Sequence, residues 1–233
     1  VLFEDDACSA VLSAMLLQQS GLFAYRKPAS SLAKNLKTLE DRMGKKIIDH
    51  RITVKNYSSL ERYNGISLLG AYEIDAEGVI PEKEITLVDK GVLRKFLNGR
   101  VPTLHAPQST GSSRYLMSNN DLVFVTAPGT IHFQIEKGSK PDKMKKALIK
   151  AAKDKGLEYG YIVRRIFGKA SMIYRVSVKD GSETQVRFAD PTNLTLAKAE
   201  QLLDISAKEN VSNFILNRQV LISMIYPSAM LLE

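Results

Sequence analysis

Apolar residues near the start of the chain recur at the spacing of one helix face. They begin after Asp5 and Asp6, either of which can cap a helix, and continue to about Gln19. The stripe consists of Cys8, Val11, Leu12, Met15 and Leu16. We therefore predict an N-terminal amphipathic helix that packs on a sheet.

A second helical pattern lies between Pro141 and Gly156. Proline suits the first turn of a helix, glycine suits its end, and Asp142 complements the positive end of the helix dipole. The apolar residues at helical spacing are Met144, Ala147, Leu148 and Ala151. Lysines occupy much of the remaining face, which predicts a lysine-rich amphipathic helix.

Most of the remaining chain alternates apolar and polar residues between turn signals, as strands do. We predict strands at residues 46–54, 68–74, 85–88, 92–96, 122–126, 132–135, 159–166, 171–178, 183–188, 214–216, 220–225 and 229–232. Asp89-Lys-Gly91 is a hairpin signal between two of them. A second helix or irregular excursion is expected at residues 32–43, a loop at 102–113 and a short helix at 196–203.

Strands grouped in hairpins, with helices apart from them, indicate an α+β fold with a mainly antiparallel β-sheet. We interpret residues 1–233 as a single domain, which is long enough to bury a sizeable core. Hydrophobic residues make up 44% and charged residues 25%, which excludes a disordered chain. No apolar run reaches the roughly 18 residues of a membrane-spanning helix, so we expect no span.

The net charge of +8 raises the question of a nucleic-acid partner. Between Lys137 and Gly156 the chain carries eight lysines and two acids. This segment contains neither arginine nor an aromatic residue, and specific nucleic-acid contacts usually use both. We interpret the lysines as the solvent-exposed face of a helix and do not expect a nucleic-acid partner.

Cys8 is the only cysteine, so the chain can form no intrachain disulfide and has no thiol pair for zinc. Disulfide-free proteins occur in every compartment, which leaves cytoplasmic and exported or periplasmic locations open. The chain begins at Val1 with neither an initiator methionine nor a signal-peptide pattern. We interpret it as a fragment or a processed form.

Several segments follow one another in a characteristic order along the chain. After the opening Val1-Leu-Phe and the acidic start of the first helix come Leu39-Glu-Asp-Arg-Met-Gly44, Tyr63-Asn-Gly-Ile-Ser-Leu-Leu-Gly-Ala-Tyr-Glu-Ile-Asp-Ala-Glu-Gly78, Ile85-Thr-Leu-Val-Asp-Lys-Gly-Val-Leu93, Leu157-Glu-Tyr-Gly-Tyr-Ile-Val-Arg-Arg165, Tyr174-Arg-Val with its Asp180-Gly181 turn, and Pro227-Ser-Ala-Met-Leu-Leu-Glu233. Together they resemble the C-terminal half of the TldD/PmbA family. That family was first described as a proposed modulator of DNA gyrase and is now regarded as a metalloprotease family. The resemblance implies a further N-terminal domain in full-length members and a homo- or heterodimer with a family member.

The resemblance also bears on catalysis. In the proteolytic branch of the family, the helix after the first strand carries His-Glu-x-x-x-His; its imidazoles hold zinc, its glutamate polarises water, and a cysteine near the C-terminus completes the site. Laid on this motif, Glu4, Asp5 and Ser9 replace the first histidine, the glutamate and the second histidine. Residues 204–233 contain no cysteine, and the three histidines lie at positions 50, 105 and 132. The resemblance therefore implies a metal-free, divergent branch, with no catalytic residue, no metal ligand and no zinc cofactor.

Other roles for the same side chains compete with structural ones. Glu4, Asp5 and Asp6 together resemble the ligand set of a hard cation such as calcium, but acids at a helix start more simply complement its dipole. Cys8 lies on the apolar stripe beside acids that raise a thiol pKa, so we expect a buried thiol and not a nucleophile. Nothing in the sequence brings His50 or His105 to a nucleophile, so structural roles are expected.

Residues 107–114, with the sequence Pro-Gln-Ser-Thr-Gly-Ser-Ser-Arg, form a candidate contact for an anion or an extended peptide. Gly111 and Ser112 can place backbone N–H groups around an anion, and Arg114 can bind a carboxylate or phosphate. The segment lacks the Lys-Ser/Thr ending of a P-loop. A plain flexible connection is the alternative.

Three functions remain open from the sequence. The leading one is a non-catalytic peptide-binding or structural module, in which an exposed sheet edge captures peptide by strand addition. The second is an active metallopeptidase that takes its zinc ligands from a missing N-terminal part or a partner chain. The third is DNA-linked binding through the lysine-rich helix, which predicts a strong dependence on salt.

Overall fold

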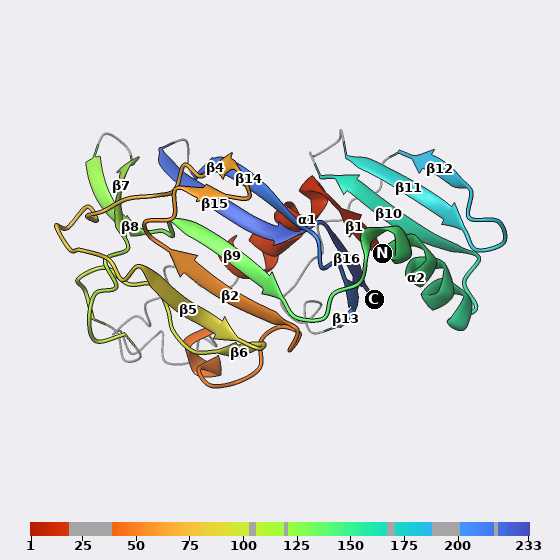
Figure 1. The fold of residues 1–233 in the computed structure, drawn as a ribbon, viewed down its shortest axis with the longest axis horizontal. Helices are drawn as coiled ribbons and strands as arrows, with labels where there is room; N and C mark the ends of the chain where they lie inside the picture. The colour runs from red at the N-terminus through yellow and green to blue at the C-terminus, as the bar shows by residue number, and fades with distance from the viewer. Residues whose placement is uncertain (19–38, 103–105, 119–120, 167–170, 188–200, 217–218) are drawn as a thin grey trace. The chain divides into compact units, whose positions relative to one another are not determined.

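The computed structural model describes residues 1–18, 39–102, 106–118, 121–166, 171–187, 201–216 and 219–233. The chain divides into two compact units that interleave along the sequence. Unit 1 contains Val1–Gln19, Ile135–Asn210 and Tyr226–Glu233, and unit 2 contains Ser20–Gln134 and Val211–Ile225. Two six-stranded sheets form the centres of the two units (Figure 1).

The first sheet, in unit 1, joins strands from both ends of the chain. The elements of this unit are β1 (Leu2–Glu4), α1 (Asp6–Leu12), the π-helical η1 (Ser13–Gln18), α2 (Pro141–Asp154), β10 (Tyr159–Arg165), β11 (Met172–Ser177), β12 (Glu183–Val186), β13 (Leu202–Ile205) and β16 (Ala229–Leu232). Its strand order is β12-β11-β10-β1-β16-β13. Strand β1 pairs in parallel with β10 and antiparallel with β16, and the other pairs are antiparallel.

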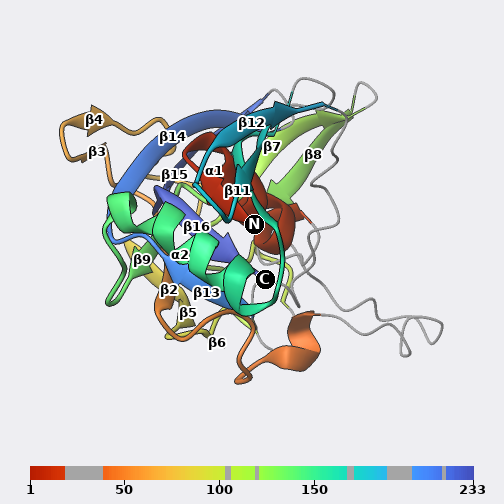
Figure 2. The same cartoon turned by 90° about the vertical axis from the view of Figure 1, so that its right-hand side faces the viewer.

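Helix α2 covers one face of this sheet, across β10, β1 and β16 (Figures 1 and 2). Its residues Met144 and Leu148 are buried in a common apolar cluster with side chains of the sheet. The sheet contributes Leu2, Ile162, Val176, Ala229 and Leu231 to this cluster. The helix expected between Pro141 and Gly156 is α2, and its Lys143, Lys146 and Lys150 are exposed.

The second sheet has the order β14-β15-β9-β2-β5-β6 and is accompanied by two separate hairpins, β3–β4 and β7–β8. The elements are η3 (Leu39–Arg42), β2 (Ile52–Tyr57), β3 (Arg62–Tyr63), β4 (Ile66–Ser67), β5 (Glu84–Asp89), β6 (Val92–Leu93), β7 (Ser113–Ser118), β8 (Asp121–Thr126), β9 (Thr130–Ile135), β14 (Glu209–Leu216) and β15 (Val220–Pro227). Strands β15 and β9 are parallel, whereas β2, β5 and β6 form an antiparallel meander. Along β2, Ile52, Val54 and Asn56 are buried and alternate with half-buried residues, as a strand with one core face requires.

The α+β fold class and the mainly antiparallel sheet are confirmed. The predicted N-terminal helix is present as α1 and continues into η1. The interpretation of residues 1–233 as one domain stays a prediction. None of the described helices combines the length and apolar character that crossing a bilayer requires.

The strand predicted at residues 68–74 is wrong. A short hairpin, β3–β4, precedes this segment, and the segment itself is irregular. The reason is a close backbone approach: a Cβ on Gly70 would lie 2.0 Å from the carbonyl oxygen of Gly129. The strand predicted at 46–54 is displaced, because β2 begins only at Ile52.

Two other predictions need correction. Strand β7 was not predicted, because its first residue was assigned to the loop at 102–113. Residues 196–200 of the predicted short helix lie outside the described part of the chain, but Leu202 and Leu203 belong to strand β13. Tertiary pairing with β16 therefore overrides the helical pattern at the end of that segment.

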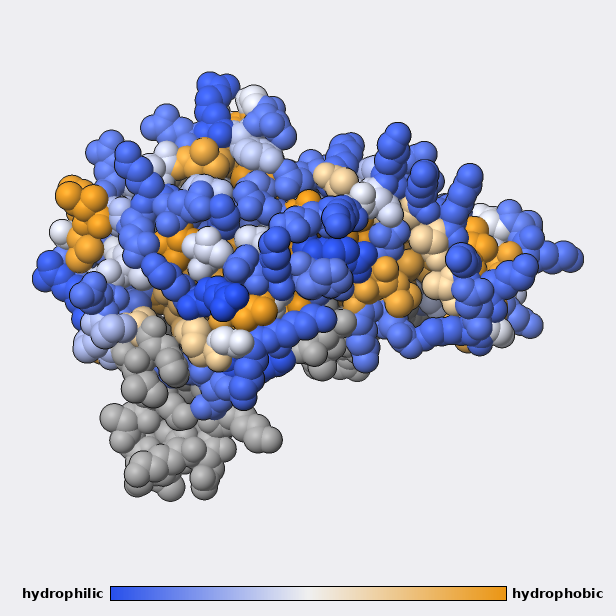
Figure 3. All heavy atoms as spheres, turned by 60° about the horizontal axis from the view of Figure 1, so that its bottom comes forward, coloured by the Kyte–Doolittle hydropathy of each residue, from blue (hydrophilic) through white to orange (hydrophobic). Residues whose placement is uncertain are grey.

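Hydrophilic residues cover most of the face drawn in Figure 3, and hydrophobic side chains are exposed between them in small groups. Scattered apolar side chains of this kind are normal on soluble proteins. The grouping of apolar residues around a pocket in unit 2 is therefore more informative than their number.

Candidate functional site

The residues that replace the zinc motif lie at the end of β1 and the start of α1. Glu4 Oε2 accepts a hydrogen bond from Arg164 Nε at 2.9 Å. Asp5 Oδ1 accepts from Asn210 Nδ2 at 3.0 Å, and Ser9 Oγ donates to the carbonyl oxygen of Asp6 at 2.9 Å. Asp5 precedes the helix with φ 47° but makes no capping hydrogen bond with its side chain, so the prediction that it caps α1 is wrong.

Glu4 belongs to a chain of ion pairs that links β1, β10, β12 and α2. Arg164 Nη2 lies 3.0 Å from Glu183 Oε2, and Lys145 Nζ lies 2.7 Å from Glu183 Oε1. The hydrogen bond from Lys145 and the charge of Arg164 hold the pKa of Glu183 below its ordinary value. The carboxylates here are therefore already balanced by cations of the protein.

The other nucleophilic and metal-binding candidates have structural surroundings. The Cys8 thiol is completely buried and donates to the Phe3 carbonyl oxygen at 3.1 Å; burial, with Asp5 and Glu4 adding, raises its pKa well above the ordinary value. His50 is exposed beside Asp49, and His132 packs against Tyr57 and Tyr63.

His105 lies outside the described residues. Within the described part of the chain, no three His, Cys, Asp or Glu side chains gather as a metal site would need.

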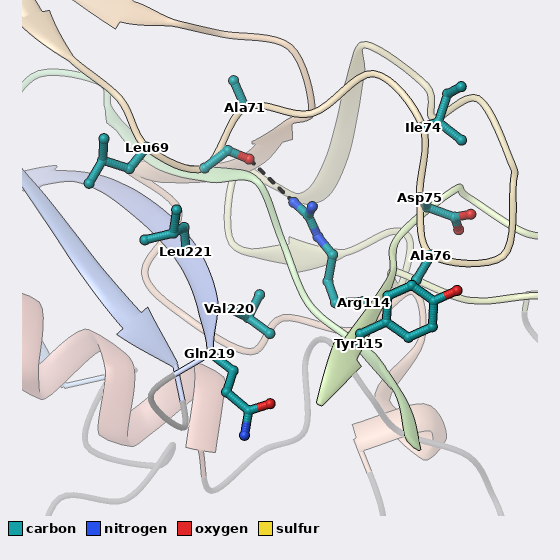
Figure 4. A pocket seen from close by; sticks show the side chains of 11 residues that line it. Leu69, Ala71, Ile74, Asp75, Ala76, Arg114, Tyr115, Gln219, Val220 and Leu221 are labelled. Carbon is teal, nitrogen blue, oxygen red and sulfur yellow. Dashed lines mark hydrogen bonds between the residues drawn. The ribbon is translucent and has the colours of Figure 1, made fainter. Parts of the chain in front are cut away.

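A pocket of about 410 Å³ opens in unit 2 between three segments of the chain. Its lining comes from the irregular segment after β4, from β7 and from the start of β15. The lining residues are Leu69, Gly70, Ala71, Ile74, Asp75, Ala76, Arg114, Tyr115, Gln219, Val220 and Leu221 (Figure 4).

The irregular segment is fixed to the sheet by buried polar contacts. Ser223 Oγ accepts hydrogen bonds from the N–H groups of Leu69 and Gly70, at 2.9 and 3.0 Å, and donates to Asn213 Oδ1 at 2.6 Å. Gly129, which meets Gly70 at its closest approach, is itself held by Asn56 Oδ1 at 3.0 Å. The wall of the pocket is therefore fixed to the sheet.

The outer edge of β7 forms another wall of the pocket. At one end, Ser113 N donates to Asp75 Oδ2 at 3.0 Å and the Ser113 carbonyl accepts from Ala76 N at 2.9 Å. At the other end, Met117 N donates to Gln219 Oε1 at 2.6 Å and the Met117 carbonyl accepts from Gln219 Nε2 at 3.1 Å. The side-chain amide of Gln219 thus makes the two bonds that a neighbouring strand would make.

Tyr115 lies between these two occupied ends. Backbone groups in a strand alternate in direction with a period of two residues, and Ser113 and Met117 both point away from β8. The N–H and C=O of Tyr115 therefore point outward as well. No hydrogen bond outside the β7–β8 ladder uses them within the described part of the chain.

Arg114 supplies the positive charge of the pocket. Its Nη2 donates to the Gly70 carbonyl oxygen at 3.2 Å, its Cζ lies 3.3 Å from the centroid of the Tyr72 ring, and its buried Nε makes no hydrogen bond (Figure 4). Burial lowers the pKa of the guanidinium, although Tyr72 and Asp75 oppose this effect. Among the ion pairs of the described residues, none includes Arg114.

Asp75 is the acid nearest in the lining, but its oxygens are engaged by the backbone. Oδ1 accepts from the N–H groups of Glu77 and Val79 at 2.9 and 2.8 Å, and Oδ2 accepts from Ser113 N. Asp75 is only 5% exposed. It therefore fixes the end of β7 and is not a free general base.

Of the three residues predicted to contact an anion or peptide, only Arg114 lines the pocket. Gly111 has φ 65° and packs on Pro81, its N–H donates to Ser109 Oγ, and its carbonyl oxygen accepts from the Tyr72 hydroxyl. Ser112 is completely buried and bonded to Thr110. Their backbone does not form the open anion cradle that the Gly-Ser pattern indicated.

Sequence reasoning missed Tyr72, Tyr115 and Gln219, which shape the pocket. A signal for β7 was present, because Asn119-Asn120 separates two apolar runs and asparagine is common in hairpin turns. No local signal marks Gln219 as the partner of a strand 102 residues away.

Comparisons with known proteins place these observations in a family context. Residues 1–178 match the family described as the PmbA/TldA metallopeptidase C-terminal domain. A search of the curated proteins gives no match.

Two solved structures share the fold at low sequence identity. TldE from Thermococcus kodakarensis has a TM-score of 0.63 and 16% identity, over 98% of this chain and 47% of that protein. A Thermotoga maritima protein described as a putative modulator of a DNA gyrase has a TM-score of 0.57 and 16% identity, over 100% of this chain and 47% of that protein. The chain thus spans about half the length of each.

Proposed function

The chain belongs to the TldD/PmbA family as a metallopeptidase C-terminal domain, and from this membership we propose that it is a peptide-binding or partner module that does not use the family's zinc chemistry. Peptidase relatives need imidazoles and a glutamate on the helix after the first strand. This chain has Glu4, Asp5 and Ser9 at those positions.

The observation that carries the proposal is the ion pair between Glu4 and Arg164. A zinc ion beside Glu4 would meet the positive charge of Arg164 at close range, and like charges repel most strongly in partly buried sites. Ser9 contributes a hydroxyl bonded within its own helix, which is a poor substitute for an imidazole.

Support for binding comes from unit 2. The pocket beside β7 combines apolar walls with a buried arginine and an unpaired backbone edge, which are features of sites that take extended peptides. We expect the partner or peptide to be recognised here, and the domain to act in a homo- or heterodimer with a family member.

Metal content and peptide cleavage test the proposal together. The purified protein is exposed to excess zinc, passed through gel filtration, and measured by inductively coupled plasma mass spectrometry and by a peptide-library cleavage assay. We expect less than about a tenth of an equivalent of zinc and no cleavage, because a zinc site needs three or four protein ligands. Zinc near one equivalent together with cleavage would overturn the proposal and favour the metallopeptidase hypothesis.

A further inference from the structure

We propose that the outer edge of β7 at Tyr115 binds an extended peptide as an added strand, with a carboxylate of the peptide beside Arg114. This inference rests on the proposed binding function and deepens it, because it names the site and the chemistry of the ligand.

The backbone of β7 provides the first argument. Its outward groups are occupied at Ser113 and Met117 and unpaired at Tyr115. The two occupied ends are four residues apart, a length of about 13 Å along a strand. An extended segment of two to three residues, roughly, fits this interval and can accept from the N–H of Tyr115 and donate to its carbonyl oxygen.

The side chains around this edge provide the second argument. Four large apolar residues of the lining are substantially exposed: Leu69 at 50%, Ile74 at 60%, Tyr115 at 49% and Leu221 at 44%. They come from three separate segments, so they surround the edge and do not continue it. In strand addition, main-chain bonds give affinity while such surrounding pockets receive alternate side chains of the ligand.

Charge provides the third argument. Arg114 lies beside the edge, partly buried, without an acidic partner in any ion pair found among the described residues. Its stacking on Tyr72 and its bond to Gly70 fix the guanidinium in place. A carboxylate is the complementary group for a fixed guanidinium, and a charge-assisted hydrogen bond there is stronger than a neutral one.

The test uses four dye-labelled hexapeptides of alternating valine and threonine and measures binding by fluorescence anisotropy. One peptide has a free C-terminus and one an amidated C-terminus, and two amidated peptides carry a central glutamate or glutamine. We expect binding by the free acid, by the glutamate peptide, or by both, at least about tenfold tighter than by its neutral counterpart. The pair that shows this difference identifies a terminal or a side-chain carboxylate as the ligand group.

Protein variants locate the bound peptide. Tyr115→Pro removes the outward N–H and leaves the β7–β8 ladder intact, because proline is tolerated at edge positions whose N–H is unused. Tyr115→Ala controls for loss of the ring. The matched control is Phe124→Pro, because Phe124 lies directly opposite Tyr115 on β8. We expect roughly tenfold weaker binding for Tyr115→Pro than for Tyr115→Ala, and no change in affinity for Phe124→Pro.

Arg114→Met keeps the aliphatic stem but removes the charge, so it should abolish the preference for the carboxylate peptides. Amide hydrogen exchange on the unmodified protein gives a readout that does not depend on any variant. We expect the Tyr115 amide to exchange at least about tenfold more slowly with bound peptide, and the Phe124 amide to be unchanged.

The remaining outcomes separate this inference from the proposed function. Peptide binding that is unaffected by Tyr115→Pro and leaves the Tyr115 amide unprotected would overturn the inference alone. Absence of binding by all four peptides would also overturn it. Stoichiometric zinc and cleavage would overturn the proposed function, whatever the behaviour of Tyr115.

Discussion

Gly70 shows how a missing side chain can determine the position of a whole segment. The carbonyl oxygen of Gly129 occupies the space where a Cβ would lie, and Ser223 binds the adjacent N–H groups. This approach turns residues 68–74 away from strand geometry and places them along the pocket. Glycine is therefore required at this position by contact and not by φ.

Gly70→Ala should destabilise the protein by roughly 2–3 kcal/mol, because backbone atoms must move to admit the methyl group. The control is Gly65→Ala, where φ is 82° and nothing lies within 4 Å, so that only about 1 kcal/mol of backbone strain is expected. Urea unfolding of both variants measures the difference in the free energy of unfolding. Equal stabilities would show that the contact at Gly70 relaxes freely.

The candidate site illustrates what single residues reveal in advance. Arg114 could be singled out because arginine in a Gly-Ser loop is a typical anion contact. Gly111 and Ser112 carried the same signal, yet their groups are bonded inside the protein to Ser109, Tyr72 and Thr110. These partners come from the tertiary fold, so the local pattern could not distinguish a cradle from a buried turn.

At the scale of elements, helix α2 is attached to its sheet by apolar packing on one side and by ion pairs at its edge. The periodicity of Met144, Ala147, Leu148 and Ala151 predicted the buried side correctly, because helix spacing alone selects one face. Strand β7 was not predicted, because its polar ends Ser113 and Ser118 resemble a loop. Its pairing with β8 stabilises it as a strand.

Leu148→Ala should cost about 2–4 kcal/mol of unfolding free energy, since the side chain is 3% exposed and packs tightly against Gly160. The control is Lys146→Ala on the exposed face of the same helix, for which a change within about 0.5 kcal/mol is expected. Thermal and urea unfolding measure both variants. A small effect at Leu148 would mean that α2 contributes little to the stability of unit 1.

The ion pairs of α2 lead to a pH prediction. The folded-state pKa of Glu183 is lowered by Lys145 and Arg164, so its contribution is complete above the pKa of the unfolded chain and is lost as pH falls through the folded-state pKa. Glu183→Gln should therefore destabilise the protein by about 1 kcal/mol near pH 7 and by almost nothing near pH 3.

Urea unfolding of the wild type and the Glu183→Gln variant across this range checks the expectation. The control is Glu158→Gln, an exposed acid near the same helix that makes no ion pair with it among the described contacts. A constant difference between wild type and Glu183→Gln at all pH values would contradict an electrostatic role.

At the scale of the molecule, the two units are interleaved, so neither is a continuous stretch of sequence. Strand β16, near the C-terminus, lies between β1 and β13 in the first sheet and gives Ala229 and Leu231 to the α2 cluster. Composition and periodicity predicted the strands and the fold class. They could not predict this partition, because it depends on pairing between residues more than 200 positions apart.

Deletion of residues 226–233 should remove the native packing of unit 1, because β1 and β13 both lose their pairing with β16. Hydrogen exchange should show loss of protection in α2 and β10, whereas β2 and β5 of unit 2 stay protected. Deletion of Glu233 alone is the control and should leave the protection unchanged. Native protection of α2 in the longer deletion would contradict the expectation.

Gln219 has a consequence for solubility. Unpaired strand edges are templates on which protein molecules assemble into intermolecular sheets. By occupying Met117, the Gln219 amide shortens the open edge of β7 to the single residue Tyr115, and Asp75 and Ala76 close its other end. One uncharged side chain thus protects the apolar hairpin from runaway aggregation while leaving an opening too short for another copy of the strand.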